Sequence, residues 1–173
     1  RWNSGALYFS DIFSHEVVSV SLERKRETVF SLKDDYPIGL GWLPDGKMLI
    51  VSMLGKKLLL GDPETKAVST YCDFSNVLAD YSPEYVINDM TVNSNGQAYV
   101  GVCALDFDEN QHIGPHNIPS FSYLLLVETD GSVKIASDRM TFPNGMAISP
   151  NGKTLVVAET FANRLTSFDI NPD

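Results

Sequence analysis

Two asparagines stand at the same distance before a turn glycine. Asn88 lies eight residues before Gly96, and Asn144 lies eight residues before Gly152. Amide and carboxylate oxygens are hard ligands that suit Ca²⁺, Mg²⁺ and similar ions. The matched spacing therefore predicts that Asn88 and Asn144 face one metal site. The alternative is that each asparagine only tightens the turn into a strand.

The two turn glycines, Gly96 and Gly152, belong to a sequence cassette that occurs four times. Each copy is a polar turn with a glycine followed by an apolar strand, and the copies recur at intervals of roughly 40 to 60 residues, as propeller blades do. The copies span residues 3–10, 44–52, 95–101 and 150–158, and their strands end on the small residues Ser10, Ser52, Gly101 and Ala158. No segment has sustained helical periodicity. We predict an all-β fold, a β-propeller with about four four-stranded blades; a β-sandwich would not require a recurring cassette.

The repeat divides the chain into a single partial propeller domain with blade-like units at about 1–34, 35–80, 81–138 and 139–173. The inner strands of the third and fourth units are predicted at Met90–Val92 and Met146–Ile148. Asn88 and Asn144 would then lie where the chain enters these strands, beside the central channel. Counting back eight residues from Gly46 gives Ile38 as the equivalent residue of the second unit.

The first and last units look incomplete. The first lacks an inner strand apart from Trp2, and the fourth lacks its outer strand. Because propellers usually close their ring and protect their edges, the chain reads as a fragment. Its open edges predict self-association, with closure of the four repeats into a small propeller as the alternative.

Composition limits the partners and the compartment. The net charge is −9, with 22 acidic and 13 basic residues, which disfavours nucleic acid and anionic membranes as partners. No apolar run approaches the roughly 20 residues of a membrane span. Two cysteines, Cys72 and Cys103, are too few for a disulfide framework and are predicted to be buried free thiols. We expect a soluble protein, and cytoplasm is slightly favoured over other compartments.

A long insertion, about Ala104–Ser122, follows the second strand of the third unit. It would emerge on the face where the inner strands begin, so it could cover the site. His112 and His116 are therefore predicted to bind substrate, with a solvated loop as the alternative. Zinc binding by this pair on a helix is disfavoured because Gly114-Pro115 lies between them. Glu159, at the end of its strand, is predicted to have an ion-pair or surface role.

Three motifs, in order, resemble the family of senescence marker protein, gluconolactonase and luciferin-regenerating enzyme. Residues 142–155 resemble its "PNG…SPDGKTLY" signature, residues 87–89 with Asn95-Gly96 its "ND…G" segment, and residues 1–12 the continuation of its "EGPRW…LYFSDI" opening. The resemblance implies a six-bladed propeller with one divalent ion in the central channel, Ca²⁺, Zn²⁺, Mg²⁺ or Mn²⁺. It also implies hydrolysis of a small-molecule lactone or ester, in which the ion polarises the ring carbonyl and a carboxylate activates water.

By this resemblance, Asn88 and Asn144 are two of four metal ligands. The other two are a Glu just upstream of Arg1 and an Asp of a later blade, so neither is in this sequence. Asp89 is predicted to bind substrate as a hydrogen-bond acceptor, with a structural role as the alternative. Some members hold substrate with an Arg at the position of Val86, which argues against a sugar lactone with many polar groups. The alternative functions are a non-catalytic binding or scaffold module and an inactive fragment lacking two metal ligands.

Overall fold

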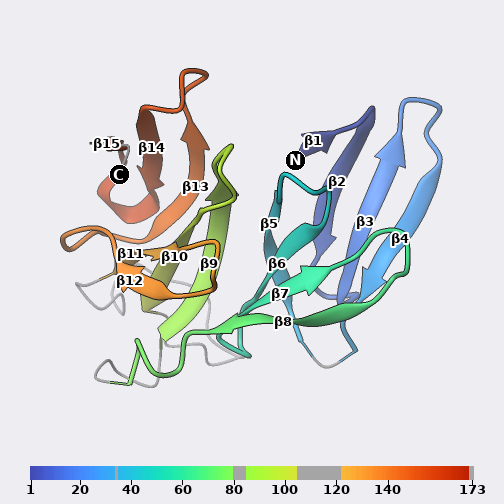
Figure 1. Cartoon of the computed structure of the whole chain (residues 1–173), viewed down its shortest axis with the longest axis horizontal. Coiled ribbons are helices and arrows are strands. Elements are labelled where there is room, and N and C mark those ends of the chain that lie inside the picture. The colour runs from blue at the N-terminus through green and yellow to red at the C-terminus, as the bar shows by residue number, and fades with distance from the viewer. Residues whose placement is uncertain (34, 80–84, 105–121, 172–173) are drawn as a thin grey trace.

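Four antiparallel sheets follow one another along the chain in a computed structural model that describes residues 1–33, 35–79, 85–104 and 122–171 (Figure 1). The first sheet contains β1 (Trp2–Asn3), β2 (Ala6–Asp11), β3 (Glu16–Ser21) and β4 (Arg26–Ser31). The second contains β5 (Pro37–Trp42), β6 (Met48–Ser52), β7 (Lys57–Gly61) and β8 (Val68–Asp73). The third contains β9 (Tyr85–Val92), β10 (Ala98–Ala104), β11 (Tyr123–Val127) and β12 (Val133–Ile135). The fourth contains β13 (Pro143–Ile148), β14 (Thr154–Glu159) and β15 (Arg164–Asp169), with the 3₁₀ turn η1 (Thr160–Ala162) between the last two.

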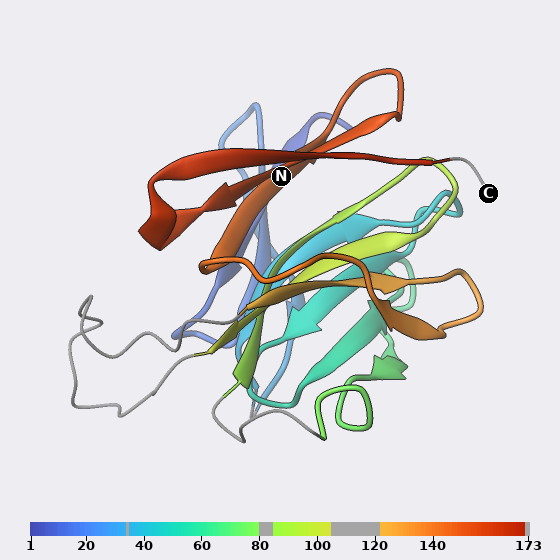
Figure 2. The same ribbon diagram turned by 90° about the vertical axis from the view of Figure 1, so that its left-hand side faces the viewer.

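These sheets are propeller blades, which confirms the predicted all-β propeller. In each sheet the strands pair in chain order, and the inner strands β5, β9 and β13 lie side by side (Figures 1 and 2). The first blade has only the two-residue β1 at its inner position, as expected, and the fourth has three strands. Exposed apolar side chains remain on these two blades, at Trp2, Leu7 and Leu165. Self-association there stays a prediction.

Close packing between blades depends on glycines in the inner strands. A Cβ added to Gly39 would lie 2.8 Å from the backbone nitrogen of Met90, and one added to Gly41 would lie 2.5 Å from Cγ2 of Val92. Both distances are too short for a real contact, so β5 can approach β9 this closely only with glycine at these positions. The largest apolar cluster fills the space between these blades, with Leu49 and Phe74 on one side and Ile87 and Val100 on the other.

Three inner strands carry a β-bulge at the same register. Two residues stand opposite one, at Ile38-Gly39 in β5, Asn88-Asp89 in β9 and Asn144-Gly145 in β13. The predicted inner strands were therefore too short: β9 begins at Tyr85 and β13 at Pro143, because pairing resumes on the far side of each bulge. The asparagines lie within the strands and not before them.

The bulge register also corrects the alignment of the repeats. The residues opposite the bulges are Gly101 in β10 and Ala158 in β14, but Val51 in β6. Ser52 was thus aligned one residue too late, because small residues near a strand end are interchangeable in a sequence pattern. The equivalence of Ile38, Asn88 and Asn144 is unaffected, since all three are the first residue of their bulge.

Two smaller findings concern the cysteines and membrane-spanning helices. Cys72 and Cys103 are buried free thiols, as expected. The described part of the chain contains no helix with the length and hydropathy needed to cross a membrane.

Glu159 forms an ion pair, but it is buried and does not lie on the surface. Its side chain is 1% exposed; Oε1 accepts from Nε of Arg164 at 2.7 Å and from Thr166 Oγ1, and Oε2 accepts from the Thr141 amide at 2.7 Å. Burial opposes ionisation, but these hydrogen bonds outweigh it and lower the pKa of Glu159 below its ordinary 4.5. The carboxylate therefore joins β14, β15 and the segment before β13.

We expect Glu159→Gln to lower the free energy of unfolding by about 1.5 kcal/mol at neutral pH, because a charged acceptor becomes a neutral amide. The folded-state pKa lies below the unfolded value, so the wild-type advantage exists above pH 4.5 and disappears as the pH falls through the folded-state pKa. Urea unfolding at pH 7 and below pH 4 measures this. Glu64→Gln, on the exposed turn before β8, is the control and should show no difference. A pH-independent deficit in Glu159→Gln would contradict the assignment.

Candidate metal and substrate site

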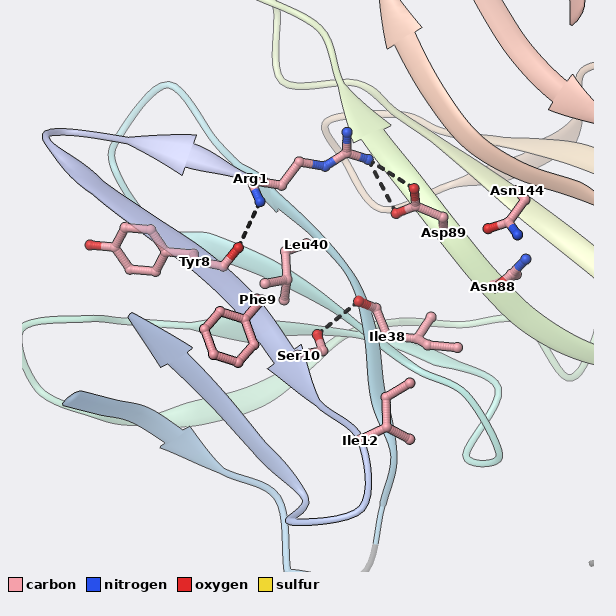
Figure 3. Close-up of a pocket in the computed structure, with 10 residues that line it drawn as sticks. All are labelled: Arg1, Tyr8, Phe9, Ser10, Ile12, Ile38, Leu40, Asn88, Asp89 and Asn144. Carbon is pink, nitrogen blue, oxygen red and sulfur yellow. Dashed lines mark hydrogen bonds and ion pairs between the residues drawn. The ribbon is translucent and has the colours of Figure 1, made fainter. Parts of the chain in front are cut away.

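A cavity of about 490 Å³ lies against the bulges of β5, β9 and β13 and the second half of β2 (Figure 3). This volume is within the usual range for small-molecule sites. Its lining contains both bulge asparagines together with residues of the first and second blades. The lining residues are Arg1, Tyr8, Phe9, Ser10, Ile12, Ile38, Leu40, Asn88, Asp89 and Asn144. The structure thus brings together Asn88, Asn144 and Asp89, three of the five predicted site residues. The other two, His112 and His116, lie outside the described residues.

The amides of Asn88 and Asn144 are held by their nitrogen atoms. Nδ2 of Asn88 donates to the Pro143 carbonyl at 3.2 Å and lies 3.5 Å from Sγ of Cys103. Nδ2 of Asn144 donates to Thr160 Oγ1 at 3.2 Å. Neither Oδ1 accepts a hydrogen bond from the described residues, so both oxygens are left for a ligand. Figure 3 shows the two side chains on neighbouring strands of the same cavity.

The bulges explain this orientation. A bulge sets two residues against one and changes the direction of the first side chain. At equal registers of adjacent blades, it aims Asn88 and Asn144 at the same space. Both asparagines lie within strands and not in a turn, and their role as metal ligands stays a prediction.

Cys103 supports Asn88 from behind. Its side chain is fully buried, and burial raises the pKa of its thiol to about 12. The thiol is therefore protonated at neutral pH and donates to the Pro143 carbonyl at 3.3 Å. Cys103 therefore helps to orient the asparagine, and it does not line the cavity.

Arg1 crosses the channel to Asp89, a contact that the sequence did not reveal. One guanidinium nitrogen lies 3.1 Å from both carboxylate oxygens of Asp89, and another donates to the Met146 carbonyl at 3.3 Å. Burial raises the pKa of Asp89, while Arg1 and the Met90 amide act in the opposite direction without cancelling the effect. No spacing rule could indicate Arg1, because its long side chain spans from the first blade to the third and fourth. Substrate binding by Asp89 stays a prediction.

The cavity contains two of the four metal ligands that the resemblance implies. The described ranges contain no group of three or more His, Cys, Asp or Glu side chains that could hold a metal. The two free amide oxygens are nevertheless suited to a hard divalent cation, and the nearest carboxylate, Asp89, is already paired with Arg1. Val86, predicted at a substrate-holding position, is instead buried against Met53, Cys103 and Phe142 and does not line the cavity.

A family model described as "SMP-30/Gluconolactonase/LRE-like region" matches residues 1–173. The chain belongs to this family. This confirms the resemblance drawn from the three motifs, and the free asparagine oxygens lie on two of them.

Relatives of this SMP-30/gluconolactonase/LRE-like chain are longer than it is. The protein named adipocyte plasma membrane-associated protein Hemomucin, from Drosophila melanogaster, is 29% identical over 138 residues, which cover 78% of this chain and 24% of that protein. The structure of a calcium-binding regucalcin from Agrobacterium tumefaciens aligns with a TM-score of 0.72 at 20% identity, covering 97% of this chain and 51% of the other. A gluconolactonase from Xanthomonas campestris aligns with a TM-score of 0.73 at 16% identity, covering 96% and 55%. At these identities the structural matches establish the fold, and the chain spans about half of each structure.

Proposed function

We propose that this chain supplies part of the active site of a divalent-metal-dependent lactonase. One observation carries the proposal: two asparagines at identical bulges of adjacent blades have anchored amide nitrogens and free oxygens in one cavity. Family membership supports it, as do the structural relatives named as a gluconolactonase and a calcium-binding regucalcin. By the resemblance, the two other ligands would lie outside these 173 residues, so the proposal concerns the full-length protein.

Asn88 and Asn144 would hold the ion. A divalent ion between them would supply Lewis-acid polarisation of the lactone carbonyl. Amide ligands are neutral, so they leave more positive charge at that carbonyl than carboxylates would, at a cost in affinity. Arg1 neutralises Asp89 and keeps its charge from opposing this effect.

The proposal is tested by chelation and reconstitution. The full-length protein is freed of metal with EDTA and dialysed. Hydrolysis of a panel of sugar, alkyl and aryl lactones is then followed by acid release, with Ca²⁺, Mg²⁺, Mn²⁺ or Zn²⁺ added singly. We expect the metal-free protein to be inactive and at least one ion to restore turnover. Circular dichroism of the metal-free protein controls for unfolding.

The second candidate is a non-catalytic binding module. The absence of an acidic cluster among the described residues favours it, because a metal site of asparagines alone binds weakly. A folded, metal-loaded protein that hydrolyses no lactone or ester would support this candidate and overturn the proposed lactonase. Hydrolysis unaffected by chelation would overturn metal dependence.

A further inference from the structure

The two sides of the cavity differ in chemistry. Its polar side comes from the third and fourth blades and carries Asn88, Asp89 and Asn144. Its other side comes from the first and second blades, where Ile12, Ile38 and Leu40 line the cavity. Figure 3 shows these apolar side chains across from the asparagines.

Ile38 occupies the register that holds an asparagine in the next two blades. It is the first residue of the β5 bulge, as Asn88 and Asn144 are in β9 and β13. Three equivalent side chains therefore point toward one space, and the second blade contributes a branched hydrocarbon to it. Ile38 is half-buried, so part of its surface is available to a ligand.

The polar side chains of Ser10 and Arg1, which lie near this wall, are already used in hydrogen bonds. Ser10 Oγ donates to the Ile38 carbonyl at 2.8 Å, and the Arg1 guanidinium is bound to Asp89 and the Met146 carbonyl. A substrate hydroxyl against this wall would lose its water without gaining a partner, which is costly. A hydrocarbon substituent would instead remove apolar surface from water.

We propose that the substrate is a lactone with an alkyl substituent, and that polyhydroxylated sugar lactones are poor substrates. This inference rests on the proposed lactonase function. The substituent lies on Ile12, Ile38 and Leu40 while the ring carbonyl faces the asparagine oxygens. Water adds to that carbonyl, the ring acyl–oxygen bond breaks, and the ring oxygen takes a proton, so the product is a hydroxy acid with an alkyl tail.

The test compares two six-membered lactones, δ-decanolactone and δ-gluconolactone. Their kcat/KM values, corrected for spontaneous hydrolysis, are measured for the wild type, Ile38→Asn and Ile135→Asn. Ile135→Asn is the matched control, because Ile135 is a partly exposed isoleucine on the outer strand β12 and does not line the cavity. We expect the wild type to prefer the alkyl lactone at least ~10-fold and Ile38→Asn to reduce this preference ~10-fold, with no change in the control. A wild-type preference for the sugar lactone, or an unchanged ratio in Ile38→Asn, would overturn the inference.

Calorimetry separates this inference from the proposed function. Binding of the two products, 5-hydroxydecanoate and gluconate, is measured whether or not turnover occurs. Selective binding of 5-hydroxydecanoate that weakens in Ile38→Asn, without turnover of any lactone, would overturn the lactonase and retain the apolar subsite. Turnover of lactones with equal binding of both products would retain the lactonase and overturn the apolar subsite.

Discussion

Asn144→Ala is expected to reduce kcat/KM of the proposed lactonase, measured on the full-length protein, at least ~100-fold and to weaken its affinity for the proposed divalent ion. The substitution removes one of the two free amide oxygens in the cavity, and a loss of several kcal/mol in charge stabilisation corresponds to such a factor. The metal-free variant should stay as stable as the metal-free wild type. Asn144 makes only one side-chain hydrogen bond within the described residues, to Thr160, and no buried group depends on it. Titration calorimetry with the ion and steady-state kinetics measure the two effects.

Two further variants test whether Asn144 acts as a metal ligand. Asn144→Asp keeps an oxygen at the site and adds a negative charge, so it should bind the ion more tightly but turn over more slowly. Asn95→Ala is the matched control, because Asn95 is an exposed turn asparagine between β9 and β10 outside the cavity. Wild-type metal affinity and turnover in Asn144→Ala would exclude Asn144 as a ligand.

The equivalence of Ile38, Asn88 and Asn144 could be predicted from the sequence because the turn glycine is a fixed reference. In each blade the inner strand runs from the bulge to that turn over a constant length, so counting back from Gly46, Gly96 or Gly152 reaches the same point. The cassettes also predicted the propeller, since each one marks a hairpin that a blade must contain.

The bulges themselves could not be predicted. A bulge breaks the alternation of buried and exposed residues that identifies a strand, so residues 85–89 lacked a regular strand pattern and β9 was assigned only from Met90. Contacts across the channel were equally inaccessible: the reach of Arg1 to Asp89 joins residues from different blades, and no local pattern encodes such a distance. The burial of Glu159 depends in the same way on partners from two other segments, the one before β13 and the strand β15.

Gly101 connects the stability of the fold to the geometry of the site. It stands opposite the bulge of β9, and a Cβ added to it would lie 2.8 Å from the carbonyl oxygen of Pro143. That oxygen accepts the hydrogen bond from Asn88, and the next residue along the chain is Asn144. A methyl group at this position must therefore displace the backbone that holds both asparagines.

We expect Gly101→Ala to lower the free energy of unfolding of the metal-free protein by about 2–3 kcal/mol, as overpacking against backbone does. The same variant should also lose metal affinity, because the displaced Pro143 carbonyl no longer fixes Asn88 and the two amide oxygens separate. Urea unfolding and metal titration on one preparation measure both effects. Ser69→Ala, on the exposed face of the outer strand β8, adds no atom and should change neither.

Measuring both the free energy of unfolding and the metal affinity distinguishes the role of Gly101 from that of Asn144. Asn144→Ala should weaken metal binding without destabilising the metal-free protein, whereas Gly101→Ala should do both, since it acts on the ligands through the backbone between blades. Unchanged metal affinity in a destabilised Gly101→Ala variant would mean that the Pro143 carbonyl does not control the placement of the asparagines. The anchoring of Asn88 through Pro143 would then have to be abandoned as the reason for the orientation of its oxygen.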